Sequence, residues 1–212
     1  MTGVATEVVI LIHGLWLAGW AMGLQQRRLD RAGFRAIAFS YPSIADDLDT
    51  NARRLAEFVA AQPEPTVHLV GHSLGGLLAL HMLEIAPDPR VRRVVLAGSP
   101  WRGSTIARTV HDWPGGETAV GRSLAQWYAA PRPDLGQRYE IGVIAGTVPF
   151  GAGTLVARLQ RPHDGTVTVE ETRLPTMADH LLLPVTHTSM LTSTAVARAV
   201  VQFLRQGRFG AP

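Results

Sequence analysis

Short apolar runs alternate with longer helix-like stretches along most of the chain, and this alternation limits the folds that the sequence can adopt. Strands are expected at 8–12, 34–39, 66–70, 91–97, 141–145 and 181–185, and helices at 19–32, 46–61, 74–85 and 189–206. Strands that are apolar on both faces are typical of a parallel sheet covered by helices on each side. We therefore expect an α/β protein with a three-layer α/β/α sandwich.

The length of 212 residues favours a single domain with one sizeable core, covering 1–212. The alternation breaks down over 98–139, where one helix is expected at 117–128. Segments inserted at the carboxyl edge of such a sheet commonly cover a ligand crevice, so 98–139 is expected to be a cap or lid. Its tryptophans, Trp101, Trp113 and Trp127, fit either a hydrophobic substrate wall or the core of a small subdomain.

The composition excludes several kinds of chemistry. The sequence contains no cysteine and no lysine, and all 20 of its basic residues are arginine. Thiol catalysis, disulfides, thiolate metal sites, Schiff bases and Ser-Lys mechanisms are therefore excluded, which leaves serine, histidine and carboxylates as candidate groups.

Charge and hydropathy indicate where the protein acts and what it does not bind. The net charge is only +3, and the arginine clusters lack interleaved aromatic residues, so we expect solvated faces and no nucleic-acid partner. No apolar run reaches 18 residues, which predicts no transmembrane segment. A leader sequence is not visible, so a cytoplasmic protein is expected, although a chain whose signal had been removed would look the same.

The segment 69–80, with the sequence LVGHSLGGLLAL, places one serine between an expected strand and an expected helix. A sharp turn there strains the backbone of Ser73 and requires small neighbours, which Gly71 and Gly75 provide. The Ser73 hydroxyl then projects beyond the carboxyl end of the strand, beside the N–H groups of the helix start. This is a nucleophile elbow of the pattern Gly-x-Ser-x-Gly. The alternatives are a turn without chemistry and a phosphate-binding turn, and the latter lacks the lysine of a Walker loop.

A serine nucleophile needs a base within hydrogen-bond reach. Histidines occur at positions 13, 68, 72, 81, 111, 163, 180 and 187. His187 follows the strand expected at 181–185, so it is expected at the same sheet edge as Ser73. His180 precedes that strand and is expected at the opposite edge, and the turn is expected to point the His72 side chain away from the attacking face. His187 is therefore the candidate base.

The base needs a carboxylate to orient it, and Asp164 is the candidate. It lies in a loop after the strand at 141–145, flanked by proline and glycine. An Asp-Gly turn with a helix-capping role is the alternative interpretation. The competing carboxylates lie before a strand, in the inserted segment or beside the opposite edge: Asp88, Asp112, Asp134 and Asp179.

A tetrahedral oxyanion needs two N–H donors from converging loops. The Leu74 N–H at the start of the helix is one candidate. The Leu15 N–H, directly after His13-Gly14 and the first strand, is the other. His13 is expected to support this loop rather than to transfer protons.

These elements together resemble the α/β-hydrolase superfamily, in its lipase and esterase branch. The resemblance is carried by Ile12-His13-Gly14-Leu15, Gly71-His72-Ser73-Leu74-Gly75-Gly76, the Asp164-Gly165 loop and His187, in that order. It implies a minimal α/β-hydrolase fold, with a mostly parallel six-stranded sheet in the order 2-1-3-4-5-6. The segment 98–139 shows no cap pattern specific to the family.

The resulting hypothesis is a serine hydrolase that cleaves carboxylic esters through Ser73, His187 and Asp164, with an acyl-enzyme intermediate and no metal or organic cofactor. Its partner is expected to be a small ester or lipid-like molecule with an apolar acyl chain, contacted by Trp16 and Trp101. An acyltransferase with the same triad and a non-catalytic binding protein with the same fold remain alternatives.

Overall fold

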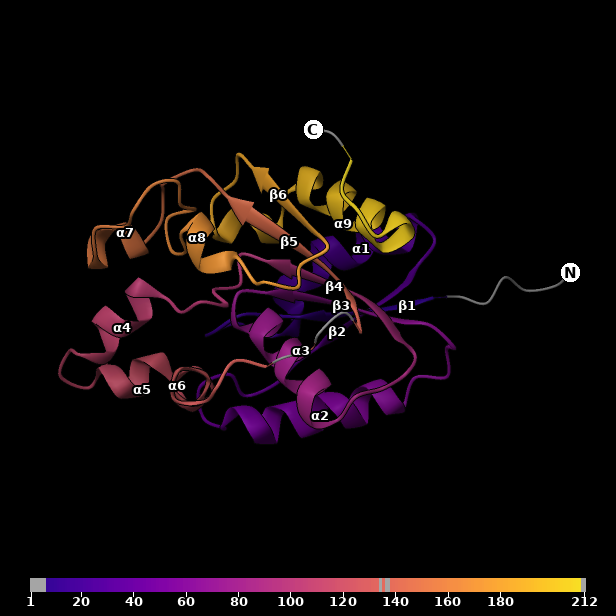
Figure 1. The fold of residues 1–212 in the computed structure, drawn as a ribbon, viewed down its shortest axis with the longest axis horizontal. Helices are drawn as coiled ribbons and strands as arrows, with labels where there is room; N and C mark the ends of the chain where they lie inside the picture. Colours follow the sequence, from indigo (N-terminus) through magenta and orange to yellow (C-terminus); the bar gives the residue numbers. More distant parts are fainter. Residues whose placement is uncertain (1–6, 134, 136–137, 211–212) are drawn as a thin grey trace, which may run out of the picture.

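A single parallel sheet forms the centre of the protein. The computed structural model describes residues 7–133, 135 and 138–210. Its six strands have the order β2-β1-β3-β4-β5-β6, and every neighbouring pair is parallel (Figure 1). The strands are β1 (Val8–Ile12), β2 (Arg35–Phe39), β3 (Val67–His72), β4 (Val91–Ala97), β5 (Glu140–Gly146) and β6 (Asp179–Leu183). The expected three-layer α/β/α fold and the strand order 2-1-3-4-5-6 are confirmed.

The sheet is buried on both faces because most side chains of its central strands are apolar. All five residues of β1 are buried, and successive side chains point to opposite faces of the sheet. Val8, Ile10 and Ile12 join the hydrophobic cluster formed with α2 (Leu48–Ala60) and α3 (Leu74–Ile85). Val9 and Leu11 join the cluster on the opposite face, formed with α1 (Gly23–Arg31) and α9 (Thr194–Gln206). Each face of the strand therefore contributes to a separate core.

Shorter helices surround the carboxyl end of the sheet, where Figure 1 shows α4, α5 and α7 beyond the strands. They are α4 (Thr105–His111), α5 (Gly116–Val120), α6 (Arg122–Ala129), α7 (Gly153–Val156) and α8 (Val169–Thr172), with 3-10 turns η1 (Gly19–Met22) and η2 (Thr188–Leu191). In the described part of the chain, no helix is both long and apolar enough to cross a membrane.

The segment 98–139 contains three short helices, α4, α5 and α6, where the sequence predicted a single helix at 117–128. Gly121, with φ of 77°, separates α5 from α6. The segment is also tied to the main fold, because Gln126 Oε1 accepts hydrogen bonds from the Leu48 N–H at 2.6 Å and the Asp49 N–H at 3.2 Å. A side chain of α6 thus satisfies free N–H groups at the start of α2.

Two further expectations on element ends are wrong. The last strand is β6, Asp179–Leu183, two residues earlier than the apolar run at 181–185, so His180 lies within the strand. Pairing with β5 sets this position, because Gly142 lies opposite Asp179. The helix expected at 189–206 is divided into η2 and α9, because Ser193 is extended and its hydroxyl caps α9 by accepting from the Val196 N–H.

Helix α3 lies directly against the ends of β1 and β3, with glycine on both sides of the contact. A Cβ added to Gly71 would lie 2.3 Å from the Gly76 Cα, and one added to Gly75 would lie 2.3 Å from the Ile12 carbonyl oxygen. Both obstacles are backbone atoms, which cannot rotate away as a side chain can. The backbone of α3 therefore packs against the sheet without intervening side chains.

We expect Gly71→Ala to lower the free energy of unfolding by at least about 2 kcal/mol, because the methyl group forces backbones apart. Gly23→Ala is the control, since Gly23 has open space around its Cβ position and a helical φ of −59°. That change should raise stability by about 0.5 kcal/mol, as alanine does at a compatible site. Urea unfolding followed by circular dichroism measures both, and equal losses in the two variants would contradict the argument.

Candidate active site

Ser73 lies in a strained turn between β3 and α3. Its φ of 53° and ψ of −123° are unusual for a residue with a side chain, and such strain persists only where the surrounding structure enforces it. The Ser73 N–H donates to the Ala97 carbonyl at 2.9 Å, which fixes the turn to the end of β4. The Ser73 side chain lines a cavity at the carboxyl end of the sheet.

Asp164 and His187 come from two loops and are bonded to each other. Asp164 lies in the loop before α8, and His187 precedes η2. The His187 Nδ1 is 2.7 Å from the Asp164 Oδ2, and the His187 backbone N–H donates to the Asp164 carbonyl at 2.8 Å. Because a carboxylate can only accept, Nδ1 carries the hydrogen and Nε2 is the nitrogen that can take a proton.

The carboxylate of Asp164 is 1% exposed, so its charge depends on hydrogen bonds from the protein. Its Oδ1 accepts from the Thr166 N–H at 2.9 Å and from the Val167 N–H at 2.7 Å. Asp164 thus has both roles that the sequence left as alternatives: its Oδ1 accepts the hydrogen bonds of the Asp-Gly turn, and its Oδ2 contacts His187.

The structure brings Ser73, Asp164 and His187 to one edge of the sheet. Ser73 and His187 line the same cavity, and His187 is bonded to Asp164. Within the described residues no hydrogen bond joins Ser73 to His187, and such bonds are often long before substrate binds.

Leu15 and Leu74, the two residues expected to supply backbone N–H donors, both line the cavity with Ser73. Leu74 is the first residue of α3, so its N–H has no preceding helical turn to bond, and Leu15 follows Gly14 in the loop after β1. A Cβ added to Gly14 would lie 3.0 Å from the Ser73 Cβ, which shows how closely the two loops meet.

His13 supports the loop that carries Leu15. Its Nδ1 donates to the Gly14 carbonyl at 2.8 Å, its Nε2 accepts from the Tyr41 N–H at 3.3 Å, and its ring stacks on the Tyr41 ring at 4.4 Å. Burial lowers the pKa of His13, so the neutral ring that makes these contacts is favoured.

The cavity has a volume of about 300 Å³ and apolar walls. Ile106, Ala107 and Val110 of α4 line it together with Val120 and Leu124. Its described lining contains no Asp, Glu or Arg, so the only ionisable groups on the wall are the rings of the histidines beside Ser73.

Of the two tryptophans expected to contact the substrate, Trp16 lines the cavity and Trp101 does not. Trp16 lines the cavity, is 63% exposed and has a positive φ of 60°. Trp101 does not line the cavity in the described residues and instead packs against the core cluster that contains the buried Trp127. Trp113 is 50% exposed. Aliphatic side chains of 98–139 therefore line the cavity, and the buried Trp127 with Trp101 fits the alternative of a core position.

The other acidic candidates have different partners. Asp88 is bonded to Arg90 at 2.7 Å, and Asp179 Oδ2 accepts from the Phe209 N–H at 2.7 Å. Asp112 is exposed beside His111, and Asp134 lies outside the described residues. Among the described residues, no group of three or more His, Asp or Glu side chains could hold a metal ion.

Three further residues of the site were not predicted from the sequence. The His72 side chain was expected to point away from the attacking face; the residue lines the cavity, and its ring lies 4.8 Å from the His187 ring. Gly98 directly follows β4, and Gly146 is the last residue of β5. A Cβ added to Gly98 would lie 3.1 Å from His187 Nδ1, and one added to Gly146 would lie 2.7 Å from Asp164 Cβ. For these two glycines, the signal available in the sequence was a glycine at the carboxyl end of an expected buried strand.

Comparison with known proteins gives a family match along nearly the whole chain. The sequence pattern of the alpha/beta hydrolase family matches residues 9–208. A protein described as "Probable esterase PIR7A" from Oryza sativa subsp. indica is 33% identical over 115 residues, which are 49% of this chain and 44% of the rice protein. The match therefore spans less than half of that relative.

Solved structures show the same fold at low identity. The lipase BlEst2 of Bacillus licheniformis has a TM-score of 0.67 and 18% identity, with 96% of this chain and 92% of that chain covered. The metagenomic carboxyl esterase MGS0156 has a TM-score of 0.71 and 18% identity, with 97% and 76% covered.

We expect Asp164→Ala to lower the free energy of unfolding by about 1–3 kcal/mol, because it leaves the buried N–H of Val167 and the partly buried N–H of Thr166 without an acceptor. Asp164→Asn keeps a side-chain oxygen for them and should lose less. Thermal unfolding of both variants measures the difference, and a smaller loss in Asp164→Ala would contradict the assignment of these bonds.

Proposed function

The chain belongs to the alpha/beta hydrolase family, and from this we propose that it hydrolyses carboxylic esters with apolar acyl groups through Ser73, His187 and Asp164. The observation that carries the proposal is the 2.7 Å bond between His187 and the buried Asp164, on the wall of the cavity that Ser73 also lines. Asp164 gives the His187 ring the tautomer that a general base requires, with Nε2 as the acceptor.

In the proposed reaction the Ser73 Oγ attacks the ester carbonyl carbon while His187 Nε2 takes the hydroxyl proton. The carbonyl oxygen becomes an oxyanion, which the N–H groups of Leu15 and Leu74 stabilise. Removing one such donor typically reduces the rate by about 10²- to 10³-fold. His187 then returns its proton to the leaving alcohol, and an acyl group stays on Ser73.

The second half of the reaction repeats these roles with water. His187 takes a proton from water, the hydroxide attacks the acyl carbonyl, and the proton returns to the Ser73 Oγ as the carboxylic acid leaves. An alcohol in place of water would give acyl transfer, which is the competing outcome of the same site.

The wall of the cavity supports an uncharged, apolar acyl group. Aliphatic residues of α4, α5 and α6 line it, and its described lining carries no carboxylate or arginine. Burial of apolar surface is worth about 25 cal/mol per Å², so these walls favour hydrocarbon chains over sugars or ions. We further propose that 98–139 is the cap of the single domain, held in place by the contact of Gln126 with the start of α2.

A fluorophosphonate probe and intact-mass detection test the triad. The wild type should gain one adduct, Ser73→Ala none, and His187→Ala should react far more slowly, with ester hydrolysis reduced by at least about 10⁴-fold in both variants. Ser40→Ala removes a serine outside the cavity and should label normally. Folded wild-type protein that forms no adduct would favour a non-catalytic binding protein, and ester products formed with added alcohols would favour an acyltransferase.

A second experiment tests the acyl site. Val110→Trp fills the cavity, so we expect kcat/KM for long-chain esters to fall by about 10-fold or more while acetyl esters change little. Arg108→Trp adds the same side chain on the exposed face of α4 and should leave the chain-length preference unchanged. A series of nitrophenyl esters measures the preference, and an equal loss for all chain lengths would place the acyl group elsewhere.

A further inference from the structure

The position of His187 depends on a short segment outside the regular helices and strands. His187 precedes η2, and residues 192–193 connect η2 to α9. Asp164 contacts the His187 ring and N–H from one side. The position of the His187 ring, and hence its proposed role as a base, therefore also depends on the contacts of the rest of this segment.

His72 contacts the segment from β3. The His72 side chain is buried, and its Nε2 is 3.0 Å from the His187 carbonyl oxygen. A carbonyl oxygen can only accept, so Nε2 carries the hydrogen and the ring is in the Nε2–H tautomer. Among the described residues its Nδ1 has no hydrogen-bond partner.

His72 remains a neutral donor over the ordinary pH range. Burial, together with the nearby ring of His187, lowers the pKa of His72 to about 3. The other titratable groups that act on it are Asp164, which raises its pKa, and His13, which lowers it. The ring therefore adds no positive charge beside His187 when His187 accepts a proton.

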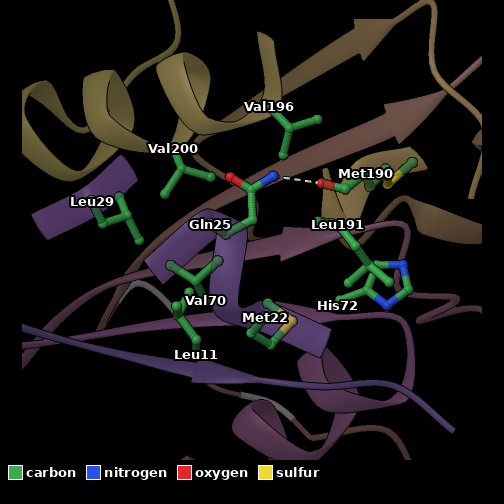
Figure 2. Close-up of a pocket in the computed structure, with 11 residues that line it drawn as sticks. Leu11, Met22, Gln25, Leu29, Val70, His72, Met190, Leu191, Val196 and Val200 are labelled. Carbon is green, nitrogen blue, oxygen red and sulfur yellow. Dashed lines mark hydrogen bonds between the residues drawn. The ribbon is translucent and has the colours of Figure 1, made fainter. Parts of the chain in front are cut away.

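Gln25 contacts the same segment from α1. Its side chain is buried, and its Nε2 donates to the Met190 carbonyl at 2.6 Å and to the Ser193 carbonyl at 3.1 Å. Figure 2 shows the amide of Gln25 reaching across to Met190. One side chain thus bonds carbonyls at both ends of the turn from η2 into α9.

His72 and Gln25 line the same small cavity beneath the segment, shown in Figure 2. The other side chains that line it are apolar, among them Leu11, Val70 and Val200. In the described part of the chain, His72 and Gln25 are the only hydrogen-bond donors to the carbonyls of His187 and Met190. Removing either side chain takes away the hydrogen bond that its carbonyl accepts, and a buried unpaired carbonyl is unfavourable.

We propose that His72 and Gln25 are positioning residues, which hold the segment of His187 from beneath and so set the place of its ring beside Ser73. This inference rests on the proposed function, because it assigns His187 the role of base. In the proposed reaction, neither His72 nor Gln25 contacts the reacting atoms. Losing the hydrogen bonds of either side chain should displace the His187 ring. A displacement near 1 Å can reduce the rate of a positioned reaction by about 100-fold.

The first experiment replaces His72. His72→Phe keeps a planar ring of similar size at the same place in the cavity lining but lacks the donor, so we expect kcat to fall by about 10- to 100-fold with a much smaller change in KM. His72→Gln carries an N–H that can reach the His187 carbonyl and should restore most of the rate. If His72→Phe does not fold, His72→Asn, whose amide is too short to reach, takes its place and should lose kcat in the same way.

The second experiment uses a matched pair on α1. Gln25→Leu removes both bonds to the segment and should lower kcat by about 10-fold or more. Gln26→Leu is the control, since the Gln26 Nε2 donates instead to the Ala36 carbonyl of β2 at 3.0 Å. It removes a side-chain bond to a backbone carbonyl without touching 187–193, so it should leave kcat unchanged.

The outcomes separate this inference from the proposed function. Wild-type protein that neither labels with fluorophosphonate nor hydrolyses esters would overturn both. Active wild type with full kcat in folded His72→Phe, or with equal kcat in Gln25→Leu and Gln26→Leu, would overturn the positioning role alone. A loss in His72→Phe that His72→Gln does not restore would also overturn it, because the donor would then be irrelevant.

Discussion

The close packing of α3 against the sheet is the constraint on which the site depends. Backbone atoms of α3 approach the end of β1 so closely that a Cβ on Gly75 would lie 2.3 Å from the Ile12 carbonyl. This approach forces the chain to reverse within one residue, and Ser73 takes the positive φ. The strain in the backbone is offset by packing on both sides, and its result is a hydroxyl at the edge of the sheet beside free N–H groups of the helix start.

Parallel strand topology collects the remaining groups at that edge. Each strand of the sheet ends on the same side, so the loops after β1, β3, β5 and β6 meet although they are far apart in sequence. Asp164 and His187 are joined there by a side-chain bond and a backbone bond. Glycines at the ends of β4 and β5 leave the space that this pair occupies.

The two sides of the site differ in chemistry. Above Ser73, aliphatic side chains of α4 to α6 enclose a cavity whose described lining has no acidic or arginine side chain, which suits the apolar group of the proposed ester. Beneath His187, buried donors from β3 and α1 hold backbone carbonyls in an otherwise apolar cavity. The side chains that support the proposed base are buried, where unpaired polar groups would be unfavourable.

The sequence by itself determined the α/β architecture, because alternating apolar runs and glycine-flanked Ser73 require it, and the family resemblance supplied the strand order that the structure confirms. It also selected Ser73, Asp164 and His187, which the structure places at one edge. Only the tertiary structure decided where strands end, how many helices lie in 98–139, and that Trp101 packs against the core while Trp16 lines the cavity. It alone brought His72 and Gln25 to the loop of His187. These features depend on pairing register and on contacts between distant segments, which local periodicity does not encode.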